Sequence, residues 1–235
     1  MNQIQMNLNN KKNLIVIFGV PGAGKGVSAQ LLKSKYKVAH ISMGDLLRKY
    51  AENKIGIGIE HQADIEGGTS LVPCEAAFGA LYQEIIKHMD DHKQIIIDGF
   101  PRTIFQLNLL NDLAEKHSVA IKFVLFDLHD ENESIRRLTT RLHCNNCGWD
   151  YILEIPKNGL QCNFCDNQVV QRPTDTKETI SKRFETYRDT TLTVVRYLQS
   201  VGKIDSIDCT VKFNEIPQMF LKYCQEHIGI GLDHD

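Results

Sequence analysis

A strand-to-loop junction near the start of the chain constrains its fold and chemistry more than any other segment. The apolar run Leu14–Phe18 leads directly into Gly-Val-Pro-Gly-Ala-Gly-Lys-Gly at residues 19–26. Glycine at these positions permits turns that a Cβ would block, so several backbone N–H groups can converge on one anion. A helix beginning near Lys25 adds the positive end of its dipole, and the lysine adds a mobile ammonium. The pattern predicts a phosphate-binding loop; the alternative is a glycine-rich turn that binds nothing.

The end of this loop departs from the general phosphate-loop pattern. Gly26 stands where a Ser or Thr hydroxyl is usual, and Val27 follows it. We therefore expect that neither position supplies a hydroxyl to a bound metal ion.

The composition is that of a globular protein whose charges nearly balance. Of the 235 residues 42% are hydrophobic, and 29 acids against 27 bases give a net charge of −2. Such a balance provides no general attraction to nucleic acid or to an anionic membrane. Met1 to Lys12 lack the apolar core of a secretion signal, and no apolar run approaches the length of a membrane span. We expect a cytoplasmic protein with no nucleic-acid or membrane partner.

Short apolar runs alternate with amphipathic stretches, which predicts repeated β-α units around a parallel sheet covered on both faces. The expected strands are Leu14–Phe18, Val38–Ser42, Gln94–Asp98, Ile121–Asp127 and Lys203–Asp208. The expected helices are Lys25–Lys35, Gly44–Glu52, Pro73–Met89, Ile104–His117, Glu131–Leu142, Thr176–Ser200 and Phe213–His227. Asn53–Val72 and His143–Gln171 break this rhythm and are expected to be insertions. Asp175, with Glu178 three residues later, resembles a capping box at the start of the helix near 176.

Four of the seven cysteines form two Cys-x-x-Cys pairs, Cys144 with Cys147 and Cys162 with Cys165. Two such knuckles supply four thiolates, which fill a tetrahedral zinc site and leave no place for a catalytic water. We therefore predict a structural Zn²⁺. Three alternatives stay open: independent or redox-active thiols, a zinc ribbon that binds nucleic acid, and replacement of one thiolate by His143.

A second group of polar residues follows the buried run that begins at Ile95, at the strand end where open α/β sheets bind ligands. Asp98 is the candidate to hold Mg²⁺ through water, because a hard cation favours carboxylate oxygen and keeps much of its hydration. Arg102 can clamp a phosphate with two hydrogen bonds. The alternatives are a helix cap or turn for Asp98 and a structural ion pair for Arg102.

Several segments together resemble the long-lid adenylate kinases: residues 19–26, Ile41–Arg48, Asp98–Thr103 with Gln106, and the later Arg172 and Arg183. The resemblance implies a P-loop NTPase-like α/β fold, in which helices flank a parallel five-stranded sheet. It also implies a core domain of residues 1–41, 73–141 and 173–235, a monophosphate-binding domain at 42–72, and a zinc-bearing lid at 142–172. The implied protein is a monomer.

The same resemblance implies the reaction ATP + AMP ⇌ 2 ADP with Mg²⁺, and a role for each matching residue. The residues expected to bind ATP are Gly22, Ala23, Gly24, Lys25, Gly26, Val27, Arg137 and Arg141. Those expected to bind AMP are Met43, Arg48, Leu71, Val72, Gly99, Arg102, Gln106, Arg172 and Arg183. Those expected to act on the transferred phosphoryl group are Lys25, Arg102, Arg137, Arg172 and Arg183. Arg137 and Arg141 are four positions apart, so on one helix they would face one ligand.

Three positions depart from the family pattern. Val27 stands where threonine is usual, Met43 where a small polar residue is common, and Cys209 where glycine is common beside the ATP base. Val27 predicts either slower turnover or a Mg²⁺ held almost wholly by Asp98, nucleotide oxygens and water. Met43 leaves the acceptor base open, and Cys209 leaves the choice between ATP and GTP open. The alternatives to an adenylate kinase are a kinase for another nucleoside monophosphate and a nucleotide-binding sensor with weak turnover.

Overall fold

The large sheet of the protein has the predicted parallel arrangement. The computed structural model describes residues 12–67, 72–92, 94–156 and 159–230. Within these residues a five-stranded parallel sheet has the strand order β2-β3-β1-β4-β8. Its strands are β1 (Asn13–Phe18), β2 (Val38–Ser42), β3 (Gln94–Asp98), β4 (Ala120–Asp127) and β8 (Ile204–Asp208). All five expected strands are confirmed, each within one residue of its predicted bounds.

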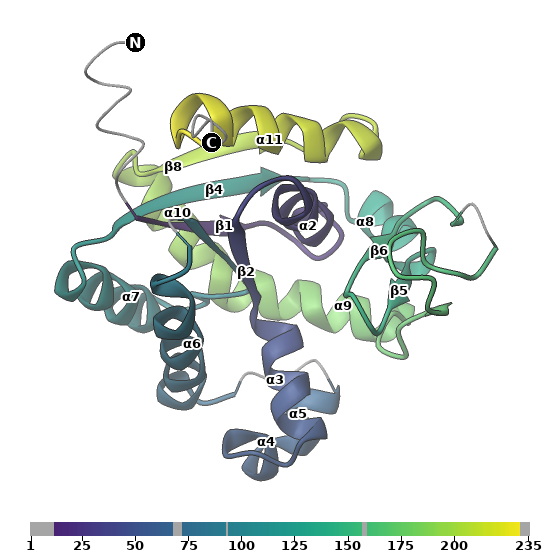
Figure 1. The fold of residues 1–235 in the computed structure, drawn as a ribbon, viewed down its shortest axis with the longest axis horizontal. Helices are drawn as coiled ribbons and strands as arrows, with labels where there is room; N and C mark the ends of the chain where they lie inside the picture. The colour runs from purple at the N-terminus through teal and green to yellow at the C-terminus, as the bar shows by residue number, and fades with distance from the viewer. Residues whose placement is uncertain (1–11, 68–71, 93, 157–158, 231–235) are drawn as a thin grey trace.

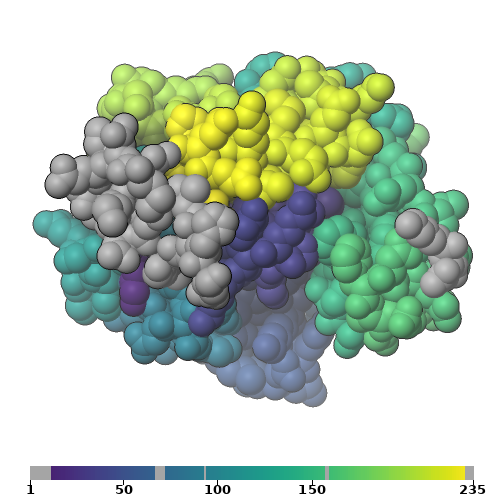
Figure 2. Space-filling model, turned by 45° about the horizontal axis from the view of Figure 1, so that its top comes forward, coloured from purple at the N-terminus to yellow at the C-terminus, as the bar shows by residue number. Residues whose placement is uncertain are grey.

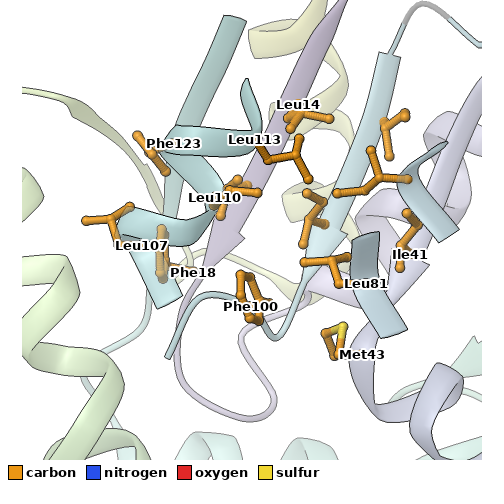
Figure 3. Close-up of a cluster of buried hydrophobic side chains, with 14 of the residues drawn as sticks. Leu14, Phe18, Ile41, Met43, Leu81, Phe100, Leu107, Leu110, Leu113 and Phe123 are labelled. Carbon is orange, nitrogen blue, oxygen red and sulfur yellow. The ribbon is translucent and has the colours of Figure 1, made fainter. Parts of the chain in front are cut away.

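Helices cover both faces of this sheet because successive residues of each strand point to opposite sides (Figure 1). Leu14, Val16 and Phe18 of β1 pack with α6, α7 and α10, whereas Ile15 and Ile17 pack with α2 and α11. Met43 belongs to the first of these clusters, beside Leu81 and Phe100 (Figure 3). The helices are α2 (Lys25–Lys35), α3 (Met43–Glu52), α4 (Ile57–Glu60), α5 (Gln62–Gly67), α6 (Cys74–Met89), α7 (Ile104–Lys116), α8 (Glu131–Thr139), α9 (Lys177–Thr186), η1 (Tyr187–Thr191), α10 (Leu192–Ser200), η2 (Phe213–Glu215) and α11 (Ile216–His227).

The helix expected over Glu131–Leu142 was predicted too long. It ends at Thr139, and the hydroxyls of Thr139 and Thr140 donate to the carbonyl oxygens of Ile135 and Arg136 in the preceding turn. Leu142 then enters a β-strand and pairs with Tyr151. The expectation that Arg137 and Arg141 share one helical face was therefore wrong.

The helix expected over Thr176–Ser200 is interrupted by a π-helical turn, η1, between α9 and α10. The extra residue of a π turn shifts the side chains that follow it, and Tyr187 and Thr191 of η1 line the main cavity described below. The predicted cap was also wrong: Thr176 is the N-cap residue and accepts from the Thr179 N–H over 3.2 Å. Asp175 is buried in an ion pair instead.

The final helix was expected to begin at Phe213, but its first three residues form the 3₁₀ turn η2 and α11 begins at Ile216. None of the helices in the described residues combines the length and the apolar character of a membrane span.

Two insertions project from the large sheet (Figure 1). The first contains α3, α4 and α5, so the segment after Asn53 holds two short helices. The second, residues 142–172, is called the lid below. It contains the three-stranded antiparallel sheet β6-β5-β7, made of β5 (Leu142–Cys144), β6 (Asp150–Tyr151) and β7 (Val169–Val170). The lid surface adjoins the segment that contains α2 (Figure 2).

Candidate functional site

A cavity of about 270 Å³, called the main cavity below, lies at the carboxyl ends of the central strands, between the two insertions. It brings together most of the predicted site residues. Those that line it are Gly22, Gly24, Lys25, Gly26, Val27, Met43, Arg48, Val72, Asp98, Gly99, Arg102, Gln106, Arg141, Arg172 and Arg183. Ala23 is fully buried and does not line it, Arg137 lies elsewhere, and Leu71 lies outside the described residues.

The glycine loop has the backbone conformation that its sequence predicts. Gly22 and Gly24 have φ angles of +81° and +99°, which side chains rarely permit. A Cβ at Gly22 would lie 2.8 Å from Ser134 Oγ and 2.9 Å from the Ser134 carbonyl oxygen. The loop therefore needs glycine here both for its conformation and for its packing against α8.

The Lys25 side chain folds back onto this loop. Its Nζ donates to the carbonyl oxygens of Gly19 over 2.8 Å and of Val20 over 3.0 Å. Burial lowers the pKa of Lys25, an effect that the nearby Asp98 carboxylate opposes. The ammonium is thus held by neutral carbonyls at the mouth of the loop, within the main cavity.

Arg102 and Gln106 form one structural unit at the start of α7. The Arg102 backbone N–H donates to Gln106 Oε1 over 2.7 Å, and Arg102 Nε donates to the Gly99 carbonyl over 3.0 Å. Burial lowers the pKa of Arg102, and Asp98 opposes that change. Since the oxygen of the Gln106 amide is engaged, its NH₂ group is the part of the side chain that can serve a ligand.

Arg48 and Arg172 meet at the other side of the main cavity. Both are close to Asp45: Arg48 is hydrogen-bonded to it, and Arg172 Nη2 lies 3.8 Å from Oδ1. Burial opposes ionisation of Asp45, but the two arginines lower its pKa to about 2. The carboxylate is therefore ionised and holds two guanidinium groups from different parts of the chain.

Arg141 and Arg183 share the buried carboxylate of Asp175. Arg141 donates to it from Nε over 2.7 Å and from Nη2 over 2.6 Å, and Arg183 Nη1 lies 3.6 Å away. Burial, with the positive charge of Arg141, lowers the pKa of Arg183 to about 10. Both arginines remain positively charged at neutral pH and line the main cavity.

Arg137 is fully buried apart from this cluster. Its Nε donates to Glu133 over 2.8 Å, its Nη2 donates to the Cys209 carbonyl over 3.0 Å, and its guanidinium lies 5.2 Å from the centre of the Phe213 ring. The Arg137 side chain therefore extends from α8 behind the glycine loop and contacts the segment that follows β8.

A second cavity of about 740 Å³ opens on this side of the loop. Val27 and Ile152 line both cavities, and Val211 and Phe213 line the second one alone. The two cavities thus flank the start of α2.

The four paired cysteines of the lid come together. Cys144 Sγ lies 3.4 Å from Cys165 Sγ, Cys147 Sγ lies 3.6 Å from Cys162 Sγ, and all four sulfurs are within 4.8 Å of one another. Zinc–sulfur bonds of about 2.3 Å in a tetrahedron would separate the sulfurs by about 3.8 Å. The cluster therefore fits a closed four-thiolate metal site. His143 points away from it, toward Asp150, with Nδ1 2.6 Å from Oδ1.

Comparison with known proteins identifies the family of the chain. The family model for adenylate kinase matches residues 17–203. An adenylate kinase of Clostridium botulinum (strain Langeland) is 33% identical over 204 residues, which cover 86% of this chain and 94% of the relative. Adenylate kinases of Clostridium tetani and Clostridium beijerinckii are 35% and 34% identical, with the same coverage.

The chain belongs to the adenylate kinase family.

Several residues of the cavities escaped the sequence analysis. Asp150 lies beside Arg141 and Arg172, but a single acid in a cysteine-rich insertion carries no sequence signal. Asp175 was visible only as a helix-cap candidate. His40, whose Nε2 is buried without a hydrogen bond in the described residues, lines the main cavity, and burial lowers its pKa. Its position on a predicted strand resembled that of an ordinary core residue.

Proposed function

We propose that this chain transfers the γ-phosphoryl group of ATP reversibly to AMP, giving two ADP. The observation that carries the proposal is the main cavity itself. Lys25 and the arginines of α3, the sheet edge, the lid and α9 all reach one space beside the glycine loop. Phosphoryl transfer between two nucleotides needs alignment and charge neutralisation, because the AMP phosphate is already mostly a dianion at neutral pH and requires no general base.

Two cavities on opposite sides of the loop suit two nucleotides. We place AMP in the main cavity, with its phosphate at Arg48 and Arg102, and the donor nucleoside in the second cavity beside Phe213. The γ-phosphoryl group would then meet Lys25, Arg102, Arg172 and Arg183. Arg137 would support the donor side by holding the Gly22 and Cys209 carbonyls, rather than by contacting the transferred group.

Gln106 favours adenine as the acceptor base. Its Oε1 accepts the Arg102 N–H, so its free NH₂ donates to a base that presents an acceptor, as adenine does at N1 and cytosine at N3. Guanine and uracil present an N–H there, which would leave two donors facing each other. Met43, which is buried, places an apolar thioether where a small polar residue is common in the family.

The proposed enzyme would use two metal ions, Mg²⁺ and Zn²⁺. Asp98 lines the main cavity beside the loop and would hold a hydrated Mg²⁺. That ion would neutralise charge on the donor phosphates. The four lid thiolates would hold a structural Zn²⁺, which would order a lid too small to form a large apolar core.

We further propose the domain limits expected from the sequence, 1–41 with 73–141 and 173–235 for the core, 42–72 for the monophosphate-binding domain and 142–172 for the lid. A monomeric, cytoplasmic enzyme without nucleic-acid or membrane partners is consistent with the near-balanced charge.

A coupled assay of ADP formation tests the proposal, with AMP, CMP, UMP and GMP as acceptors. AMP is expected to be the best acceptor, CMP the next, and GMP and UMP the poorest. Tight binding of ATP and of a mimic made of two joined adenosines, without transfer to any acceptor, would instead indicate a nucleotide-binding sensor.

A further inference from the structure

The Asp150 carboxylate of the lid lies among the positive groups that line the main cavity. Asp150 is 6% exposed, and it lines the cavity from strand β6. Its Oδ2 lies 3.5 Å from Arg141 Nη1, and its Oδ1 lies 3.4 Å from Arg172 Nη2. One carboxylate thus takes up Arg141 Nη1 and Arg172 Nη2, which could otherwise meet a phosphate group, while Arg141 Nε and Nη2 stay with Asp175.

The same carboxylate lies over the beginning of the phosphate loop helix. A Cβ added to Gly26, in the first turn of α2, would be 3.9 Å from Asp150 Oδ2. The first turn of a helix attracts anions through its free N–H groups and its dipole. The carboxylate therefore stands at a position suited to a phosphate oxygen.

A pair of hydrogen bonds holds Asp150 in this place. Its backbone N–H donates to Gln30 Oε1 over 3.3 Å, and Gln30 Nε2 donates to the Gly148 carbonyl. Gln30 belongs to α2, so one side-chain amide joins the lid backbone to the helix that begins at the phosphate loop.

Asp150 carries a negative charge in this environment. Burial opposes ionisation, but the hydrogen bond with His143 and the charges of Arg141 and Arg172 outweigh it, so the pKa of Asp150 lies below its usual range. His143 Nδ1 lies 2.6 Å from Asp150 Oδ1 and 2.8 Å from Arg172 Nη2. The Asp150 carboxylate, the His143 imidazole and the Arg172 guanidinium therefore lie within hydrogen-bond distance of one another.

We propose that Asp150 is an internal anion that occupies a phosphate position in the unliganded protein and weakens the binding of the donor triphosphate. The donor displaces it from Arg141 and Arg172, and the lid contact through Gln30 has to adjust at the same time. This inference rests on the proposed function, in that it takes the polyphosphate of a nucleotide as the ligand of the glycine loop.

Calorimetric titration of wild type, Asp150→Asn and Asp150→Thr with ATP, inorganic tripolyphosphate and AMP tests the proposal. Both variants remove the charge, and threonine suits a strand. Asp166→Asn is the control, because it removes the same charge from an exposed lid position with a positive φ that asparagine tolerates. We expect about tenfold tighter binding of ATP and tripolyphosphate to both Asp150 variants, a smaller change for AMP, and no change in the control.

The outcomes separate this inference from the proposed function. Failure of the wild type to bind ATP would contradict the proposed function. If the wild type binds ATP and the Asp150 variants bind it equally or more weakly, Asp150 supports the lid instead of competing with phosphate, and the inference is overturned. Thermal unfolding and zinc content show whether the variants fold, and loss of folding in both Asp150 variants would also overturn the inference. Equally tighter binding of ATP to Asp166→Asn would do the same.

Discussion

Arg141 donates two hydrogen bonds to the carboxylate of Asp175, over 2.7 Å and 2.6 Å. The pair joins the two chain segments that connect the lid to the rest of the protein, and Asp175 is 3% exposed. Arg183 lies 3.6 Å from the same carboxylate. One buried acid therefore orients two guanidinium groups of the main cavity and fixes both connections of the lid.

Replacing Asp175 by asparagine is expected to lower the free energy of unfolding by about 3 kcal/mol, because it leaves buried positive charge without its partner. Urea denaturation measures this loss. Glu178→Gln is the matched control: Glu178 is exposed and pairs with Lys182 over 3.1 Å, so its loss should cost less than about 1 kcal/mol. Equal effects of the two substitutions would contradict a structural role for the Asp175 ion pairs.

Replacing Lys25 by methionine is expected to reduce turnover by at least about 100-fold and to raise the melting temperature of the unliganded protein. Turnover falls because the ammonium that would neutralise phosphate charge is lost. Stability rises because a buried charge is removed. Lys35→Met, at an exposed position of the same helix, is the control for both measurements.

The stability gain of Lys25→Met should also depend on pH. Burial lowers the pKa of Lys25 in the folded protein below its ordinary value of 10.5. At pH values between the lowered pKa of the folded protein and 10.5, the unfolded chain binds more protons than the folded one. The free energy of unfolding of the wild type therefore rises with pH in that window. The difference in melting temperature between variant and wild type should therefore narrow there, and a constant difference would show that charge burial is not its cause.

Replacing Gly22 by alanine is expected to lower both the melting temperature and the affinity for ATP. The φ angle of +81° disfavours a side chain, and the Cβ would contact Ser134 at 2.8 Å. Gly79→Ala is the matched control, since a Cβ at that exposed helical position meets nothing within 4 Å. It should leave ATP binding unchanged and raise stability by up to about 1 kcal/mol.

Removal of the Zn²⁺ proposed for the four lid thiolates is expected to loosen the lid while the large sheet stays folded. Chelation should release one zinc per chain and increase hydrogen exchange at β5 and β6, with little change at β1 and β3. Cys162→Ser should bind less than one equivalent of zinc, whereas Cys74→Ser, whose thiol lies outside the cluster, should keep it. Unchanged exchange in the lid after chelation would argue against a structural metal.

Replacing Val27 by threonine is expected to raise the turnover number by up to about tenfold, by adding a hydroxyl beside the phosphates and the metal. Val27 lines both cavities, so its side chain is placed to meet the donor. Val27→Ala removes bulk without adding a hydroxyl and should leave turnover near the wild-type value. A rise in both variants would attribute the effect to space instead of hydrogen bonding.

Much of the fold could be predicted because its signals are local. Leu14–Phe18 forms a strand because its residues are apolar on both faces, and the glycines that follow need little beyond their own conformational freedom to form the loop. The residues of that loop and of Asp98–Arg102 meet because the carboxyl ends of parallel strands share one edge. Their convergence in the main cavity follows from strand order.

The parts that were mispredicted depend on contacts that the local helical pattern does not contain. Asp175 has the local pattern of a helix cap, but a buried ion pair with Arg141 is the stronger interaction. Arg137 and Arg141 have helical spacing, but pairing of Leu142 with Tyr151 ends the helix between them.

Local patterns account for the parallel sheet, the phosphate loop and the cysteine cluster, because apolar period, glycine conformation and thiol spacing act over a few residues. The pairing of each arginine with its acid, and the position of Asp150 over the first turn of α2, arise only when the chain is folded. Those choices depend on contacts between separate segments, from Arg141 and Asp175, 34 residues apart, to Gln30 and Gly148, 118 residues apart, which no local pattern records.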